Sequence, residues 1–187
     1  MLYGGRISLT VGILSVALGT TGATLVGIAS GYFGGWVDLA IQRAVDSFMA
    51  FPGLVLLLLI IAIAGPGLDR VVLAISIFLV FAPSRVIRSS ALTIRQREYV
   101  TAAQALGATD GRVLVRHILP NVFPVVIVLA SMAIGQAILI EASLSFLGLG
   151  VPPPAISWGA MIGGSARTYF TEAPWMAFFP GAALALT

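Results

Sequence analysis

Few side chains in this sequence are of types that carry out chemistry. Of its 187 residues, ten are basic and seven are acidic, and every basic residue is Arg. There is no Cys, and His117 is the single His, so thiolate metal sites are excluded and a His/carboxylate cluster is not expected. The absence of Lys excludes a Walker A phosphate loop, because that loop needs its Lys to bind ATP phosphates. We therefore expect no catalytic site, no metal site and no cofactor in this chain.

Two polar side chains lie within an otherwise apolar stretch. Insertion scales assign roughly 2.5–3.5 kcal/mol to a charged side chain at the centre of a bilayer, which makes Glu141 a candidate for a translocation path. It lies about 30 Å of helix beyond the start of its stretch, near one interface, so an interfacial or structural role is the alternative. Gln136 lies deeper and is the better candidate to face a wet interior. Without charges at mid-span, an ion-coupled secondary transporter is disfavoured.

The composition predicts an integral membrane protein. Hydrophobic residues make up 59% of the sequence and charged residues only 9%, whereas about 25% of the residues in a soluble domain are charged. The mean hydropathy of +1.06 agrees. Since one membrane span needs roughly 20 apolar residues, the sequence contains enough of them for about five spans. The net charge of +3 is too small for a nucleic-acid-binding surface.

The apolar stretches predict the elements that position these residues. We expect spans at 7–30, 51–64, 71–88 and 122–147 and a last one starting at 175, the second being short. Segment 31–50 is too polar to cross and predicts an interfacial helix. In the first stretch, small residues recur at every fourth position, which favours close packing against another helix. These residues are Ser15, Gly19, Ala23, Gly27, Gly31 and Gly35.

The distribution of Arg predicts the orientation. Short loops rich in Arg stay on the cytoplasmic side. The segment between the third and fourth spans contains Arg85, Arg88, Arg95, Arg97, Arg112 and Arg116. We therefore expect a cytoplasmic loop at about 89–120, with 31–50 also inside. Segment 150–174, which contains Arg167, is then expected on the periplasmic side.

Within the predicted cytoplasmic loop, residues 97–107 predict a short helix. Ala, Gln, Glu and Leu favour a helix, and Gly107 would end it in a left-handed conformation. Tyr99, Ala102, Ala103 and Leu106 share one face at helical spacing. Such a helix suits docking into a groove of a partner protein, and a helix lying on lipid is the alternative. Asp110 is expected to cap a second short helix, through residue 115, before the chain re-enters the membrane at 117–120.

Two strings in this loop carry a resemblance to a known family. Thr101-Ala102-Ala103 followed by Gly107, and then by His117-Ile118-Leu119-Pro120, resembles the EAA motif of ABC importer permeases. Thr101 stands where the motif has Glu, and His117 stands where it has an apolar residue. More narrowly, the chain resembles dipeptide, oligopeptide and nickel permeases. Supporting strings lie at 31–38, 50–53, 97–100, 141–150, 157–159 and 173–175.

The resemblance implies an all-α, polytopic transmembrane helix bundle of the type I ABC importer permease kind. The chain would form a single permease domain over 1–187, lacking the family's first span and the end of its last. The loop helix would be a coupling helix that docks on a separate ATPase subunit. Its implied contact set is Glu98, Thr101, Ala102, Ala103, Leu106 and Gly107.

The implied function is the permease of an ATP-driven peptide importer in a bacterial or archaeal inner membrane. Implied partners are ABC ATPase subunits, a second homologous permease that completes a heterodimer, a periplasmic substrate-binding protein and membrane lipid, and not nucleic acid. Import of nickel or another chelated metal is the alternative within the family. An alternative from another class is a non-transporting membrane scaffold whose basic loop binds anionic lipid.

Overall fold

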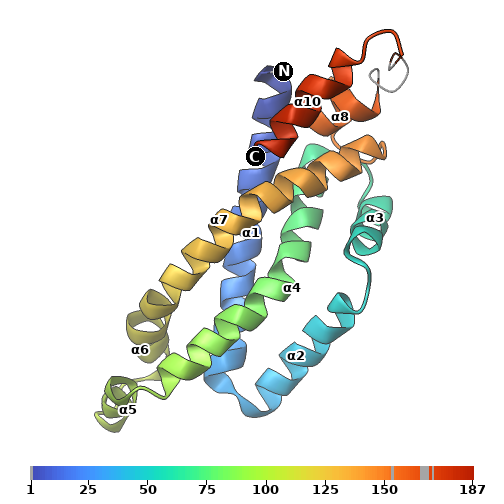
Figure 1. The fold of residues 1–187 in the computed structure, drawn as a ribbon. Coiled ribbons are helices and arrows are strands. Elements are labelled where there is room, and N and C mark those ends of the chain that lie inside the picture. The colour runs from blue at the N-terminus through green and yellow to red at the C-terminus, as the bar shows by residue number, and fades with distance from the viewer. Residues whose placement is uncertain (1, 153, 165–168, 170) are drawn as a thin grey trace. The chain divides into compact units, whose positions relative to one another are not determined.

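The computed structural model consists mainly of helices (Figure 1). It describes residues 2–152, 154–164, 169 and 171–187, so Arg167 and part of segment 150–174 lie outside the described residues. The described part of the chain contains no strand. In chain order, the helices are α1 (Leu2–Phe33), α2 (Gly35–Met49), α3 (Gly53–Ala64), α4 (Leu68–Arg95), α5 (Glu98–Ala105), α6 (Asp110–Val113), the π-helical η1 (Leu114–Ile118), α7 (Leu119–Phe146), α8 (Trp158–Gly163) and α10 (Trp175–Ala185).

Three of the described helical segments are long and apolar enough to cross a membrane. They are α1, α4 and the 37-residue segment Asp110–Phe146, in which α6, η1 and α7 follow one another without a break. The expected first, third and fourth spans are therefore present. The expected second span corresponds to α3, which has only 12 residues. The helix axis bends by 92° between α2 and α3, and these two helices make a fourth candidate span only if they are counted as one. The last apolar run forms α10, with 11 residues.

The connection from α6 into α7 differs from the expected one. The second short helix does not end at residue 115, because the chain continues through a π-helical turn into α7. That turn ends at Ile118, two residues before Pro120, which has no N–H to donate, and the helix continues past this position. The prediction that Asp110 caps the helix is also wrong. Thr109 occupies the N-cap position, and the Asp110 carboxylate accepts a hydrogen bond from Tyr32.

The chain forms two compact units. Unit 1 contains residues 1–18, 52–78 and 132–187, and unit 2 contains 19–51 and 79–131. Both segments expected on the cytoplasmic side, 31–50 and 89–120, lie in unit 2. Segment 150–174, expected on the other side, belongs to unit 1.

In unit 2, small residues of α1 allow close approach to α4. A Cβ added to Gly27 would lie 2.6 Å from the carbonyl oxygen of Ser84. A Cβ on Gly31 would lie 2.6 Å from the carbonyl oxygen of Arg88. The row of small residues is therefore a packing surface at these positions. Gly35, the last of the row, has open space around it and instead adopts a φ of +52° at the start of α2.

We predict that Gly27→Ala destabilises the protein, because the added methyl group must push α4 away. Overpacking of this kind typically costs about 1–3 kcal/mol. The melting temperature of the detergent-purified protein should fall by roughly 2–4 °C for each kcal/mol. The matched control is Gly111→Ala in α6, where the added Cβ meets nothing within 4 Å outside its own stretch of helix. Equal melting temperatures for Gly27→Ala and the parent would contradict the close packing.

Candidate functional site

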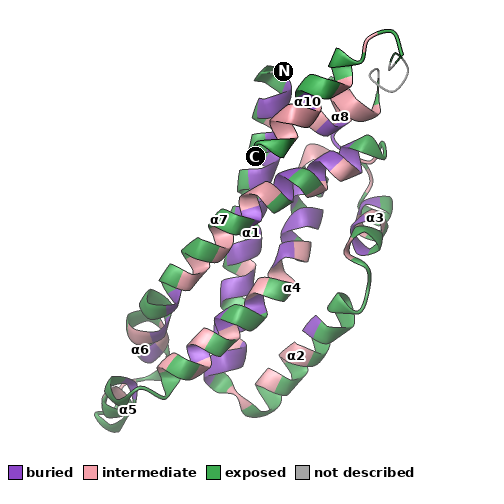
Figure 2. Ribbon diagram, viewed as in Figure 1, coloured by how far each residue is buried: buried purple, intermediate pink, exposed green. Residues whose placement is uncertain are grey.

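The helix α5 has one buried side and one exposed side (Figure 2). On the buried side, Val100 is 0% exposed and Ala103 is half-buried. On the other side, Leu106 is 89% exposed and Tyr99 46% exposed. Of the six residues in the predicted contact set, all except Ala103 are exposed. The structure therefore presents most of this set on the surface, as docking requires.

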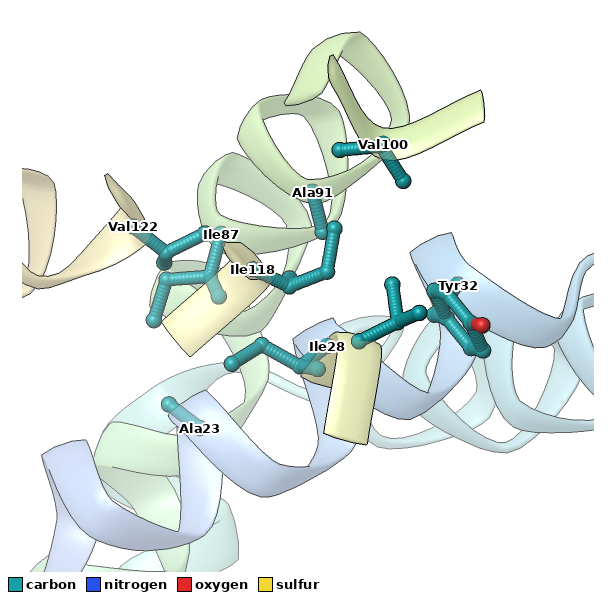
Figure 3. Close-up of a cluster of buried hydrophobic side chains, with 9 residues drawn as sticks. Ala23, Ile28, Tyr32, Ile87, Ala91, Val100, Ile118 and Val122 are labelled. Carbon is teal, nitrogen blue, oxygen red and sulfur yellow. The ribbon is translucent and has the colours of Figure 1, made fainter. Parts of the chain in front are cut away.

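The anchor of α5 is Val100, which sequence analysis did not single out. It packs in the hydrophobic core of unit 2, formed by α1, α4, α5 and the α6–α7 segment (Figure 3). The cluster consists of Ala23, Ile28, Tyr32, Ile87, Ala91, Val100, Val113, Ile118 and Val122. A lone Val between polar residues gives little signal by itself. Its spacing of three residues from Ala103 is the pattern that could have indicated a second apolar face.

The end of α5 has the hydrogen bonds of a Schellman motif. The amide of Ala108 donates to the carbonyl of Ala103 at 3.0 Å, and the amide of Gly107 donates to the carbonyl of Gln104 at 2.9 Å. Gly107 has a φ of +81°, a conformation that other L-residues adopt only with strain. The prediction that Gly107 ends the helix in a left-handed conformation is confirmed. The motif turns the chain sharply and leaves Leu106 and Gly107 on the surface.

A polar contact joins α5 and α6 to the end of α1. The Tyr32 hydroxyl donates a hydrogen bond to Oδ1 of Asp110 at 2.7 Å and accepts one from Nε2 of Gln104 at 3.3 Å. The guanidinium carbon of Arg95 lies 5.6 Å from the centroid of the Tyr32 ring, within the range of a cation–π interaction. One aromatic side chain thus contacts α4, α5 and α6 from the last turn of α1.

Two of the Arg residues that sequence analysis assigned to membrane orientation also form ion pairs with α2. Arg88 pairs with Asp38, and Arg85 pairs with Asp46. Asp38 lies in α2, which is not one of the three long apolar segments. Its hydrogen bonds from the Arg88 guanidinium and from the Ser30 hydroxyl lower the pKa of its carboxyl below the usual range. The carboxylate is therefore charged at neutral pH. Spacing along the sequence gives no signal for such long-range pairs.

The other Arg residues of the loop lie on the surface, and Arg95 among them also contacts the Tyr32 ring. Arg95, Arg97, Arg112 and Arg116 are exposed. His117 is half-buried in η1, with its ring centroid 6.0 Å from that of Tyr99. The four Arg residues lie on both sides of α5 in the sequence. They suit either carboxylates of a protein partner or anionic lipid.

In unit 1, Glu141 is a fully buried carboxylate with both oxygens hydrogen-bonded. Its Oε2 accepts from the Ser8 hydroxyl at 2.9 Å, and its Oε1 accepts from the Ser145 hydroxyl at 2.6 Å. The network continues from Ser145, which accepts from the Ser157 hydroxyl at 3.1 Å, and from Ser8, which accepts from the amide of Trp158 at 3.3 Å. Glu141 thereby ties α1, α7 and the start of α8 together.

This geometry separates the two residues proposed for a translocation path. Gln136 lies on the exposed surface of α7. Glu141 is fully buried in unit 1, and both of its carboxyl oxygens accept hydrogen bonds. This arrangement favours a structural role for Glu141 over one in lining a translocation path. The strings at 141–150 and 157–159 are thus brought together by hydrogen bonds, although they are separate in the sequence.

Comparison with known proteins places this arrangement in a family. Residues 23–187 match the family described as the binding-protein-dependent transport system inner membrane component. The chain belongs to this family. It is 44% identical over its whole length to the glutathione transport system permease protein GsiD of Pectobacterium atrosepticum, covering 62% of that protein. It is 40% identical to the dipeptide transport system permease protein DppC of Alkalihalophilus pseudofirmus, covering 100% of this chain and 61% of the relative.

Solved structures of the same fold are ABC transporters. A chain of the MetNI methionine ABC transporter in an inward-facing conformation matches with a TM-score of 0.73 at 18% identity, covering 100% of this chain and 88% of that one. An amino acid ABC transporter solved with histidines matches with a TM-score of 0.66 at 18% identity, covering 99% and 84%. These structures confirm the expected fold of a type I ABC importer permease. The chain spans about three fifths of the length of the curated relatives it matches.

We predict that Glu141→Leu destabilises the protein, because the hydroxyls of Ser8 and Ser145 lose their acceptor. Leaving buried polar groups unpaired typically costs about 1–3 kcal/mol. Glu141→Gln keeps one acceptor oxygen and should lose less. Thermal unfolding in detergent measures both variants against Glu172→Leu, a control at an exposed position. A melting temperature for Glu141→Leu equal to that of this control would refute the structural role.

Proposed function

We propose that this chain forms the membrane-spanning part of a permease subunit in an ATP-driven, binding-protein-dependent importer of dipeptides or oligopeptides. The observation that carries the proposal is the surface of α5 in a chain of this family. This helix exposes small residues, packs against the core through Val100 and ends at Gly107. Relatives named for glutathione and dipeptide transport support a peptide cargo over nickel or another chelated metal.

In this proposal, ATP is hydrolysed on separate ABC ATPase subunits, and this chain has no catalytic role of its own. The exposed side of α5 is the contact surface for the ATPase. Thr101 and Ala102 are small, so a partner can approach the helix backbone closely. The neighbouring Arg95, Arg97, Arg112 and Arg116 would pair with carboxylates on that partner. Unit 2, which includes 31–50 and 89–120, would then face the cytoplasm.

The remaining partners follow from the same proposal. A second, homologous permease would complete a heterodimer and supply half of the translocation path. Gln136, exposed on α7, is the proposed path-lining residue in this chain, and Glu141 supports the path by holding α1, α7 and α8 together. A periplasmic binding protein would deliver the peptide near segment 150–174. ATP binding would move α5 with the ATPase and switch the spans between inward-facing and outward-facing arrangements.

We predict that Ala102→Trp in the full-length parent blocks binding of the ATPase, because the indole fills the space that the partner must occupy. Co-purification in mild detergent from native membranes measures this, with a Walker-type ATPase and a second permease expected alongside the parent. The ATPase should be lost from Ala102→Trp and retained by Thr93→Trp, a control at an exposed position on α4.

The same experiment tests the scaffold alternative. If no ATPase accompanies the parent, the importer proposal fails. Binding of anionic vesicles that is lost on charge reversal at Arg95 and Arg97 would then support a lipid-binding loop instead.

A further inference from the structure

The helix α5 is covalently connected to α4 and α6 but not to α1. Two residues, Gln96 and Arg97, join α4 to α5, and residues 106–109 join α5 to α6. A displacement of α5 therefore reaches α4 and α7 directly along the backbone. It reaches α1 through contacts between helices, which are the close packing of Gly27 and Gly31 on α4 and the side chains that join α1 directly to α5 and α6. The direct route from α5 to α1 depends on those few side chains.

Tyr32 is the α1 residue that makes these contacts by both its ring and its hydroxyl. The side chain is 3% exposed and packs in the core cluster that also contains Val100 of α5. Figure 3 shows Tyr32 on the ribbon of α1, with its hydroxyl at the tip of the ring. The hydroxyl makes one hydrogen bond as donor, to Asp110, and one as acceptor, from Gln104. Both bonds end on the α5–α6 segment.

The last turn of α1 also leads on to α2. Ser30 donates to Asp38, and Gln42 donates to Ser30 at 3.0 Å, while Asp38 is held by Arg88 of α4. Between the helices, Gly34 and Gly35 have φ values of +65° and +52°, so the chain turns where other residues would be strained. A shift of the end of α1 is thereby passed to α2 as well.

We propose that Tyr32 is a positioning residue that transmits movement of α5 to α1, so that it sets how much transport each ATP produces. This rests on the proposed function, because it takes α5 to be the segment that the ATPase moves. Tyr32 lies on the side of α5 opposite the docking surface, so its hydroxyl affects transmission and not binding of the ATPase. It contacts neither the peptide nor ATP, and acts through Gln104 and Asp110.

The test is Tyr32→Phe, which removes the hydroxyl and keeps the ring in the core. The full-length permease, its partner permease, the ATPase and the binding protein are reconstituted in vesicles. Uptake of an equimolar mixture of radiolabelled dialanine and glutathione is measured together with ATP hydrolysis. We expect ATPase binding and ATP hydrolysis to be retained and uptake per ATP to fall on the order of five-fold. Tyr3→Phe, which removes a hydroxyl from an 86% exposed tyrosine of α1, is the control and should keep the parent ratio.

Gln104→Met supplies a second measurement, because it removes the same hydrogen bond from the other side. Because Tyr32→Phe already removes the bond to Gln104, the double variant should lose no more uptake per ATP than Tyr32→Phe alone. If the two residues acted independently, the two single losses would instead multiply. A merely structural role for Tyr32 would reduce the amount of folded complex and leave uptake per ATP unchanged, and that result overturns the proposal.

The outcome also separates this proposal from the proposed function. A parent complex that shows no ATP-driven uptake overturns both. A parent that transports peptide, with Tyr32→Phe showing the same uptake per ATP, overturns the role of Tyr32 alone.

Discussion

The arrangement of the candidate docking segment depends on the burial of Val100. Isolated helices shorter than about 12 residues are marginal in water, and α5 has only eight. Its helical form therefore depends on packing against α1, α4 and the α6–α7 segment, where Val100 is fully buried. With that side held, the opposite side is left with small or exposed residues. If a partner binds a short helix that is rigid, its movement is passed on to the connected membrane segments. If the helix were flexible, the same movement would only deform it.

Six charged residues in the described part of the chain hold helices together. Asp38 and Asp46 pair with Arg88 and Arg85, and Asp110 accepts a hydrogen bond from Tyr32. Glu141 is bonded to two serines within unit 1. The carboxyl groups of Asp38 and Glu141 have little or no exposure, and both have partners, as the energetic cost of burying a polar group requires. Arg95, Arg97, Arg112 and Arg116 are exposed on either side of α5 in the sequence, where a partner is proposed.

The features predicted from the sequence are those that local chemistry determines. The apolar runs predicted α1, α4 and most of α7, and Gly107 predicted the end of α5 because only Gly adopts its backbone conformation without strain. Burial of Val100, the Arg88–Asp38 pair and the network around Glu141 were not predictable, because each depends on residues distant in the sequence. The continuous helix through Pro120 was also missed, because proline usually interrupts a helix and here a π-helical turn precedes it.

The central claim is that the exposed side of α5 contacts the ATPase, and site-specific crosslinking tests it most directly. The 187 residues contain no Cys, so a single Cys can be introduced at Leu106, which is 89% exposed, and labelled with a photoactivatable maleimide. The control is Leu2→Cys, which is 92% exposed and belongs to unit 1. In the purified complex of the full-length parent, the account predicts a crosslink to the ATPase from position 106 and none from position 2. A complex that contains the ATPase but gives no crosslink from position 106, or gives one only from position 2, would contradict it.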